Sequence, residues 1–390
     1  MATLHRYQWR DAEIDRLRGA GLERERVPMN RRRPGYLEVD GREYVDMASN
    51  DYLGLAADPR INAAVSTFLL NNGWGAGASP LISGYHPAHA ELERELADFE
   101  GCESVLCLGS GFVANFGTLA AIASEGDVIF SESRNHASLI DGCRLSRAKV
   151  EIYQGNRLED LEERLRQATG YLRRIVVTDS VFSMEGDIAP LHDLCDLADR
   201  FDAILYVDEA HATGVLGRTG RGVAELLGVE DRVPLRMGTL SKSLGSVGGF
   251  LVADSEWIQY LLHKSRTYVY STALPAACAV AASTALKILR GEPERKDRVC
   301  RLADQVRARL RAVGVDCGRS ATPILPIVIG DPERTMKVAD FFRNEGFWTG
   351  AIRPPTVPIA TSRLRVSLNC AIPDHEIERF VDLFDKTKSF

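Results

Sequence analysis

The sequence predicts an α/β protein with a mainly parallel central sheet flanked by helices and a smaller C-terminal α+β domain. Between about residues 100 and 250, short runs rich in β-branched residues alternate with helical patterns. This alternation is typical of parallel strands joined by helical crossovers. Beyond about residue 290 the alternation stops, and helical patterns flank a strand-like run. The change of pattern predicts a second, smaller domain.

Composition excludes several classes of protein. The chain has 390 residues, of which 45% are hydrophobic and 26% charged, so it can bury a large core in two or more domains. A net charge of −6 argues against general binding of nucleic acid or of a membrane surface. No stretch has the composition of a signal-peptide core or a membrane span, which favours a cytoplasmic protein. Eight cysteines without a C-x-x-C pair suit reduced, buried thiols and no metal site.

Six strands are expected in the central sheet. They are the runs at 103–108, 127–130, 149–153, 174–179, 203–208 and 235–240. Two intervening helices are legible from apolar residues at helical spacing. One is marked by Leu158, Leu161 and Leu165, and the other by Leu191 and Leu194 behind Pro190, which suits a helix start.

The C-terminal part has its own pattern. A charged, breaker-rich stretch at 291–298 precedes a helix marked by Leu302, Val306 and Leu310, and TPILPIVIG (322–330) has the composition of a strand. A closing helix carries Ile377 and Phe380 on one face. We therefore expect an N-terminal arm at 1–45, which packs against the small domain or a partner subunit, a large domain at 46–284 and a small domain at 285–390.

Three polar motifs follow predicted strands, at the edge where open parallel sheets bind ligands. The first is VDEAH (207–211). The Asp208 carboxylate could pair with a protonated heterocycle, and His211 could reach a neighbouring phenolic oxygen. On these residues alone, an aspartate that caps the next helix explains Asp208 equally well.

The second motif is GTLSKS (238–243). A lysine there points toward the same edge, and Schiff-base chemistry needs an amine whose pKa is lowered by burial or by a nearby cation. Most lysines are solvated surface residues. Small neighbours and the hydroxyls of Thr239 and Ser241, which suit phosphate contacts, set Lys242 apart from that group.

The third motif is LGSGFVANFG (108–117), a glycine turn that opens a helix and suits a phosphate group. It also fits a rival function. Gly109, Gly111 and Ala114 match a dinucleotide fingerprint, and Glu132 lies where a ribose-binding acid is expected, so a nicotinamide dehydrogenase stays open at this point. A helicase-type ATPase with DEAH at 208–211 does not, because the chain has no Gly-Lys dipeptide and therefore no P-loop.

In their order along the chain, the motifs resemble the α-oxoamine synthase family of fold-type I pyridoxal-5'-phosphate (PLP) enzymes. The resemblance covers nearly the whole chain. The matching segments are SNDYLGL (49–55), SGFVAN (110–115), NHASLIDG (135–142), SVFSMEGD (180–187), VDEAH (207–211), GTLSKSLG (238–245), YSTALP (270–275), AIRPPTVP (351–358) and RLRVSL (363–368). A dehydrogenase would explain the glycine turn and leave the other motifs without a use.

The resemblance assigns roles around the cofactor. It implies that Lys242 carries PLP as a Schiff base and that Asp208 pairs with the pyridinium nitrogen, so that carbanion charge drains into the ring. His211 and Ser183 would contact the phenolic oxygen, and His136 would stack on the ring. The remaining cofactor contacts would be Gly111, Phe112 and Thr239 at the phosphate, with Ser271 and Thr272 reaching it from the other subunit of a homodimer.

The resemblance also assigns the substrates. Asn50 and Arg365 would bind the amino-acid carboxylate, with Thr356 in the adjoining substrate segment, because a guanidinium fork matches a carboxylate. Arg24 is the candidate for the distal carboxylate of the acyl donor. AIRPPTVP (351–358) points to the branch of the family that condenses L-alanine with a pimeloyl thioester. The expected protein is a PLP-dependent acyltransferase.

Three points stay open at this stage. The donor could be bound to coenzyme A or to an acyl carrier protein. Sister enzymes of the family use glycine and other acyl thioesters, so the amino acid is also open. Pro80 departs from the arginine or glycine of many relatives near the acyl-donor region, which leaves the donor contacts there undefined.

Overall fold

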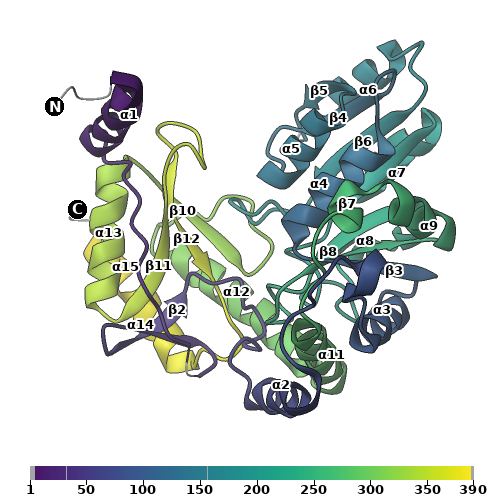
Figure 1. The fold of residues 1–390 in the computed structure, drawn as a ribbon. Helices are drawn as coiled ribbons and strands as arrows, with labels where there is room; N and C mark the ends of the chain where they lie inside the picture. Colours follow the sequence, from purple (N-terminus) through teal and green to yellow (C-terminus); the bar gives the residue numbers. More distant parts are fainter. Residues whose placement is uncertain (1–4, 32, 156, 388–390) are drawn as a thin grey trace.

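The structure, a computed structural model, describes residues 5–31, 33–155 and 157–387. Two β-sheets, each with its own helices, lie side by side (Figure 1). Helix α12 (Glu294–Ala312) runs between them and bonds to both sides. Arg295 donates to the carbonyl of Leu53 at 3.0 Å, and Arg307 donates to the carbonyl of Thr322 at 2.9 Å. No helix of the described residues is both long and apolar enough to cross a membrane.

The larger sheet confirms the predicted mainly parallel arrangement. Among the described residues its order is β3 (Ser104–Leu108), β9 (Gly249–Ala253), β8 (Leu235–Thr239), β7 (Ala203–Asp208), β6 (Arg174–Asp179), β4 (Val128–Glu132) and β5 (Lys149–Tyr153). The pairs from β8 to β5 are parallel, whereas β9 runs antiparallel to both of its neighbours. Strands β3, β8, β7 and β6 therefore end at the same edge of the sheet, where the three motifs lie.

Strand β9 was not among the expected strands. It follows β8 through the loop 240–248 without a helical crossover, so the alternation that predicted the other strands could not predict it. Its sequence, GFLVA, is a short uniform apolar run, which periodicity alone does not assign. The six expected strands all form, with ends shifted by at most two residues.

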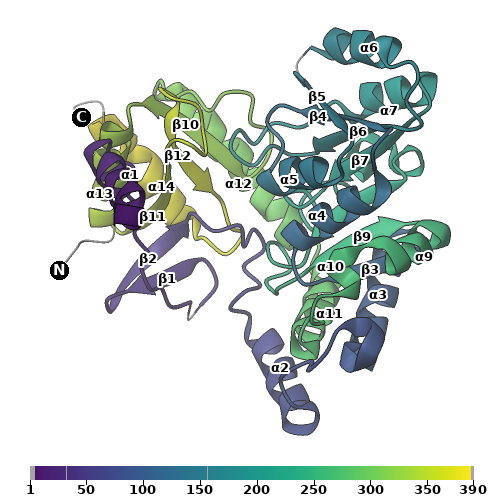
Figure 2. The same ribbon diagram turned by 45° about the horizontal axis from the view of Figure 1, so that its top comes forward.

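Helices cover both faces of the large sheet (Figure 2). They are α3 (Pro87–Glu100), α4 (Gly111–Ile122), α5 (Ala137–Leu145), α6 (Leu158–Gln167), α7 (Leu191–Arg200), α8 (Val223–Leu227), α9 (Ser255–Lys264), α10 (Arg266–Val269) and α11 (Ala276–Gly291). The apolar spacings read from the sequence are the buried faces, since Leu161 and Leu165 of α6 and Leu191 and Leu194 of α7 are all buried. Helix α2 (Pro59–Asn72) packs against α11.

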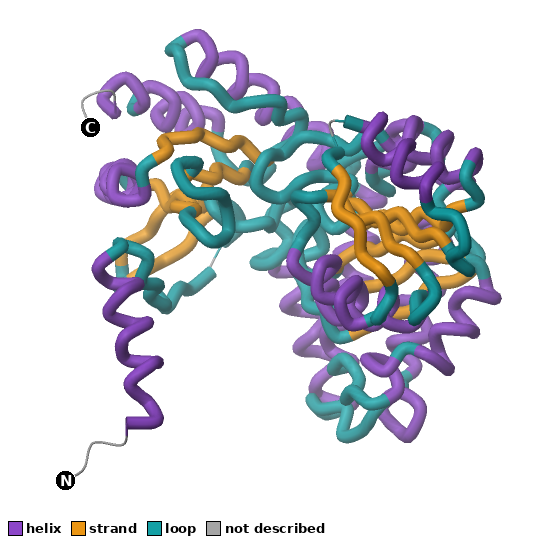
Figure 3. Tube along the Cα trace, turned by 90° about the horizontal axis from the view of Figure 1, so that it is seen from above, coloured by secondary structure: helices purple, strands orange, loops and turns teal. Residues whose placement is uncertain are grey.

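The smaller sheet combines strands from both parts of the chain near its ends, and both termini lie on its side of the molecule (Figure 3). Its order is β1 (Tyr36–Val39), β2 (Arg42–Met47), β11 (Phe347–Ile352), β12 (Ser362–Ser367) and β10 (Ile324–Gly330). Helices α13 (Pro332–Asn344), α14 (Asp374–Asp382) and α15 (Phe384–Thr387) accompany it, and α1 (Gln8–Gly19) lies at the start of the arm. Part of the expected arm is thus integrated in this sheet through the parallel pair β2–β11.

The domain limits read from the sequence stay a prediction, and two elements cross them. The limit at 284/285 falls inside α11, and β2 spans the limit at 45/46. The charged stretch at 291–298 is less of a break than expected, because α12 begins at Glu294 within it.

Candidate active site

A cavity of about 250 Å³ opens at the edge where β3, β6, β7 and β8 end. It brings together most of the cofactor residues expected from the sequence. Its lining consists of Ser110, Gly111, Phe112, Asn115, His136, Ser138, Asp179, Asp208, Ala210, His211, Met237, Thr239, Ser241 and Lys242. The three sequence motifs thus meet in one place, as expected for ligand sites of parallel sheets.

Lys242 lies three residues after β8 and lines this cavity. Among the described residues its ammonium group makes no hydrogen bond, which leaves the amine available. Burial lowers the pKa of Lys242 to about 8, against the opposing effect of the carboxylates of Asp208 and Asp179. A lysine with a lowered pKa holds a larger neutral, nucleophilic fraction near neutral pH, as Schiff-base formation requires.

Asp208 ends strand β7 and is buried. Its Oδ1 accepts the backbone N–H of Ala210 at 2.8 Å, and its Oδ2 accepts the Asn115 amide at 2.7 Å. The hydroxyl of Tyr206 donates to Asn115 Oδ1 at 2.8 Å and thereby fixes the orientation of that amide. The carboxylate caps a turn, since residues 209–220 form no helix, and it faces the cavity with a defined orientation.

His211 lies in the turn after β7, and its Nδ1 is 2.7 Å from the hydroxyl of Tyr52. Burial, with the cations Lys242 and Arg365 nearby, lowers the pKa of His211 well below its ordinary value. The imidazole is therefore neutral at physiological pH. Its Nε2 has no hydrogen-bond partner among the described residues, although His211 lines the cavity.

His136 does two things at once. It is the N-cap of α5, where its Nδ1 accepts the backbone N–H of Ser138 at 3.3 Å and contacts the Ser138 hydroxyl at 2.7 Å. Its ring also lines the cavity, 6.4 Å from the ring of Phe112 in an edge-to-face arrangement. His136 therefore caps a helix and faces the ligand space at the same time.

The glycine turn forms a cradle at the start of α4. Ser110 caps this helix through its hydroxyl, which accepts the backbone N–H of Val113 at 3.1 Å. The N–H groups of Gly111 and Phe112 have no acceptor within the helix and lie at its positive end, which suits a phosphate. A Cβ at Gly249 would come within 2.6 Å of Gly111, so only glycine at 249 lets β9 and this turn lie so close. Thr239 lies 2.8 Å from Ser241, hydroxyl to hydroxyl.

Arg365, on β12, is the small sheet's contribution to the site. It is only 6% exposed, yet its three nitrogens bond to neutral oxygens: the carbonyl of Ser183, the hydroxyl of Ser367 at 2.8 Å and the side-chain carbonyl of Asn50 at 3.0 Å. No carboxylate of the described residues pairs with it. A buried guanidinium without an anionic partner is costly, so this site is built for an anion from solution.

Some expected site residues lie outside this cavity. Ser183 meets Arg365 through its backbone carbonyl. Ser271 and Thr272 are exposed, and neither lines the cavity of its own chain. Arg24 and Thr356 are exposed and bond to each other, with Arg24 Nη2 3.2 Å from Thr356 Oγ1. Their roles stay predictions.

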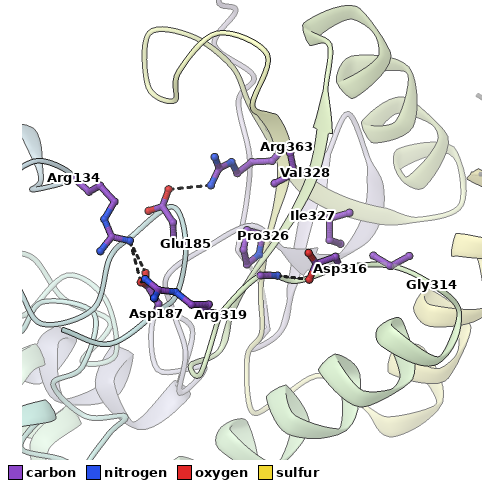
Figure 4. Close-up of a pocket in the computed structure, with 12 residues that line it drawn as sticks. Arg134, Glu185, Asp187, Gly314, Asp316, Arg319, Pro326, Ile327, Val328 and Arg363 are labelled. Atoms are coloured by element: carbon purple, nitrogen blue, oxygen red, sulfur yellow. Dashed lines mark hydrogen bonds and ion pairs between the residues drawn. The ribbon is translucent and has the colours of Figure 1, made fainter. Parts of the chain in front are cut away.

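A larger cavity of about 520 Å³ lies between the two sheets and is shown in Figure 4. Its charged side chains are already matched among themselves. Arg134 and Arg319 both pair with Asp187, at 3.0 and 3.3 Å, and Arg363 pairs with Glu185 at 3.0 Å. The cations that line this cavity are therefore already paired, in contrast to Arg365. Asp316 also lines it, and its carboxylate accepts the backbone N–H of Gly318 at 2.8 Å.

The surroundings of Glu132 exclude the nicotinamide dehydrogenase, in which this residue would bind a ribose. Its carboxylate accepts the backbone N–H groups of Arg134 and of Gly155, the latter at 3.0 Å, and it also pairs with the Arg134 guanidinium at 3.1 Å. It is 2% exposed and has no free oxygen for a ribose hydroxyl. The residue that carried the dehydrogenase reading has a structural role.

Sequence reasoning missed three polar residues of the site. Asn115 orients Asp208, Asp179 accepts the His136 backbone N–H at 2.7 Å, and Tyr52 contacts His211. Burial and the neighbouring Asp208 raise the pKa of Asp179 well above its ordinary value. Asp179 ends β6 as Asp208 ends β7, and this shared position was the available signal. Asn115 and Tyr52 lie inside quoted motifs but carried no assigned role.

Comparison with known proteins places this geometry in context. Residues 42–384 match the family described as aminotransferase class I and II. An 8-amino-7-oxononanoate synthase of Anaeromyxobacter dehalogenans is 44% identical over 373 residues, covering 96% of this chain and 94% of that protein.

Solved structures give the same fold. A serine palmitoyltransferase from S. paucimobilis with bound PLP superposes with a TM-score of 0.93 at 28% identity, covering 99% of this chain and 98% of the other. An 8-amino-7-oxononanoate synthase from Francisella tularensis superposes with a TM-score of 0.77 at 26% identity, covering 89% and 98%. Both confirm the fold expected from the resemblance.

Proposed function

We propose, from the premise that this chain belongs to the aminotransferase class I and II family, that it is a PLP-dependent acyltransferase making 8-amino-7-oxononanoate for biotin biosynthesis. It joins L-alanine to a pimeloyl thioester. A carbon–carbon bond forms between Cα of alanine and the thioester carbonyl, the thiol leaves, and the alanine carboxylate departs as CO2. The relatives of that name, similar over nearly the full chain, support this reaction over others of the family.

The site residues fit the cofactor. Lys242 supplies an amine for its aldehyde, the first N–H groups of α4 with Thr239 hold its phosphate, and buried Asp208 keeps a proton on its ring nitrogen. When bound, the pyridine ring of PLP draws in the electron pair left on Cα of the amino acid. Solved serine palmitoyltransferases that contain PLP and the cradle geometry at Gly111 support this assignment.

The chain's own residues supply binding and proton transfer. Lys242 Nζ takes the proton from Cα of L-alanine, His136 covers one face of the ligand space, and Arg365 with Asn50 holds the alanine carboxylate. The observation that carries the proposal is the buried Arg365 guanidinium without an anionic partner beside a lysine of lowered pKa. A free amino acid offers both groups that this pair requires: a carboxylate and an α-hydrogen.

The donor end of the site is proposed on the arm. Arg353 donates to the carbonyl of Glu23 at 3.2 Å and to that of Gly21, and Arg24 bonds Thr356, so the arm and the 351–358 segment hold each other. Arg24 then supplies the cation for the distal carboxylate of the pimeloyl group. The thiol carrier, coenzyme A or a carrier protein, binds outside these contacts. We assign the reaction to the cytoplasm.

We also propose that the active unit is a homodimer in which Ser271 and Thr272 of one subunit complete the phosphate site of the other. Apolar side chains are exposed around α2 and these two residues, which supports an interface there. They include Leu70 at 84% exposure, Ile82 at 80% and Tyr270 at 72%. A monomer would leave this apolar surface in water.

The alternative function is a related reaction of the same family, that of a serine palmitoyltransferase, and backbone similarity favours it. The backbone superposes more closely on a serine palmitoyltransferase, TM-score 0.93, than on the solved 8-amino-7-oxononanoate synthase, TM-score 0.77. Sequence identity points the other way, 44% against 28%. Backbone similarity reports the shared fold and the relative placement of two domains, whereas substrate choice depends on side chains, so identity decides between them.

The test supplies purified protein with PLP and offers L-alanine, glycine or L-serine, each with pimeloyl-CoA or palmitoyl-CoA. Release of free thiol and CO2 with L-alanine and pimeloyl-CoA, and a product of the mass of 8-amino-7-oxononanoate, supports the proposal. Turnover with L-serine and palmitoyl-CoA, or with glycine in place of alanine, would assign the protein to a sister activity. Absence of any PLP absorbance would refute the cofactor.

A further inference from the structure

We propose that Tyr52 is a positioning residue that holds His211 in the tautomer with its proton on Nε2, directed at the ligand in the active site. The two residues come from distant parts of the chain, the 48–58 segment and the turn after β7, and their contact is short, 2.7 Å from the Tyr52 hydroxyl to His211 Nδ1. The tautomer of His211 is independent of the proposed function; only the identity of the ligand that Nε2 contacts rests on it.

The surroundings of the hydroxyl decide the direction of this hydrogen bond. Tyr52 is 1% exposed, and burial raises its pKa to about 12 although the Arg365 guanidinium nearby opposes the rise. The phenol therefore keeps its proton at neutral pH. Because a guanidinium can only donate, the lone pairs of the phenol oxygen face Arg365, and the phenol proton points elsewhere.

Two acceptors compete for that proton. Asn50 Oδ1 is 3.3 Å away and already accepts from Arg365 at 3.0 Å, whereas His211 Nδ1 is 2.7 Å away. The phenol therefore donates to His211 Nδ1, because hydrogen bonds weaken as they lengthen. With Nδ1 as the acceptor, a neutral imidazole carries its one hydrogen on Nε2, the nitrogen without a partner among the described residues.

The same contacts join two parts of the site. Arg365 donates to Asn50, Tyr52 lies beside Asn50, and Tyr52 bonds His211. Burial disfavours a second proton on the His211 ring, and so do the nearby cations Lys242 and Arg365 and, more weakly, His136. Tyr52 thus links the residue that holds the amino-acid carboxylate to the residue that meets the cofactor's phenolic oxygen.

The first test needs no cofactor. In protein labelled with 15N-histidine and freed of PLP, the His211 ring signals are identified by their loss in His211→Asn. We expect the Nε2–H tautomer in the natural protein and a shift toward a mixture of tautomers in Tyr52→Phe. An Nδ1–H tautomer in the natural protein overturns the proposal whatever the variant does, and it does so without bearing on the reaction that the enzyme catalyses.

The second test uses the PLP-loaded enzyme and its visible absorbance as a function of pH. The N–H at Nε2 of His211 stabilises the negative phenolic oxygen of the cofactor. If Tyr52 no longer aligns His211, that oxygen becomes more basic and the proton shared with it is lost only at higher pH. The pH midpoint should rise by about 1 unit in Tyr52→Phe, as expected for one hydrogen bond. An unchanged midpoint together with unchanged His211 signals refutes the positioning role.

Tyr153→Phe is the matched control. Tyr153 ends β5, is fully buried like Tyr52, and its hydroxyl has no hydrogen-bond partner among the described residues. The control loses the same atom from a similar environment without touching His211. We expect it to leave both the His211 signals and the pH midpoint unchanged. Equal shifts in both variants would show a general effect of removing a buried hydroxyl and would overturn the proposal.

Discussion

Replacing Arg365 by glutamine should abolish recognition of the amino-acid carboxylate while leaving the fold intact. A carboxylate bound by the guanidinium fork makes two charge-assisted hydrogen bonds, each worth about 1.5–3 kcal/mol. Their loss amounts to about 3–6 kcal/mol, or a fall of about 10²- to 10⁴-fold in kcat/KM for L-alanine. Arg365→Lys keeps the charge but not the planar fork and should lose less.

The effect on stability should be small for a reason specific to this site. Arg365 donates to three neutral oxygens, and its charge has no anionic partner among the described residues. Removing that charge relieves its desolvation cost, which offsets the lost hydrogen bonds, so unfolding should become easier by no more than about 1 kcal/mol.

Arg363→Gln is the matched control. Arg363 lies on the same strand with the same 6% exposure, but it pairs with Glu185 at 3.0 Å. Its loss leaves the Glu185 carboxylate without that partner and should lower the melting temperature more than Arg365→Gln does, with a smaller effect on alanine binding.

Alanine binding is followed by the change in visible absorbance of the PLP-loaded protein, and unfolding by calorimetry. Our reasoning about the buried cation would be refuted by an Arg365→Gln protein that binds L-alanine within threefold of the natural enzyme, or by equal losses in the two variants.

Three further predictions test the rest of the site. The rate at which cofactor-free protein incorporates PLP should rise about tenfold per pH unit up to about pH 8 and then level off, because the neutral amine of Lys242 is the reacting form. Stopped-flow absorbance measures this rate. A rate that stays constant between pH 6 and 8 would contradict the lowered pKa. Arg24→Ala should raise KM for pimeloyl-CoA about tenfold or more and leave KM for L-alanine unchanged, whereas a change confined to alanine would place Arg24 elsewhere. If subunits share their sites, mixing inactive Lys242→Ala with an inactive double variant, Ser271→Ala with Thr272→Ala, should restore up to about a quarter of the natural activity, because each hybrid dimer has one intact site. Sedimentation should show a dimer. If no activity returns although subunit exchange is demonstrated, the cross-subunit contact is refuted.

The parts of the fold that sequence predicted well are those with a local signal. Six strands of the large sheet and the faces of α6 and α7 follow from spacing along the chain. Strand β9 and the pairing of β2 with β11 depend on contacts between segments with no periodic pattern of their own, and the second pair is separated by about 300 residues. Periodicity reports which face of an element is buried, and it carries no information about its partner.

The site shows the same division. Lys242, Asp208 and His211 were identifiable because they lie in motifs at strand ends, whereas Tyr52 and Asn115 act through side chains that only the folded chain brings to them. Arg365 illustrates what structure adds. The sequence assigned it a role, but the absence of a carboxylate partner among the described residues, which suits it to bind an anion, depends on side chains that only the folded chain brings together.

The two-sheet architecture has a consequence for how this enzyme could change during evolution. The proposed roles divide between the two sheets: the lysine, aspartate and histidine assigned to the cofactor follow strands of the large sheet, and Arg365, Thr356 and Arg24, assigned to the substrates, belong to the small sheet and the arm. Mutations in β12, the 351–358 segment or the arm can therefore explore new acyl donors and new amino acids while the reactive apparatus is inherited unaltered. Selection can act on substrate preference as a trait nearly independent of catalytic competence, which is a condition for one scaffold to diversify into many enzymes.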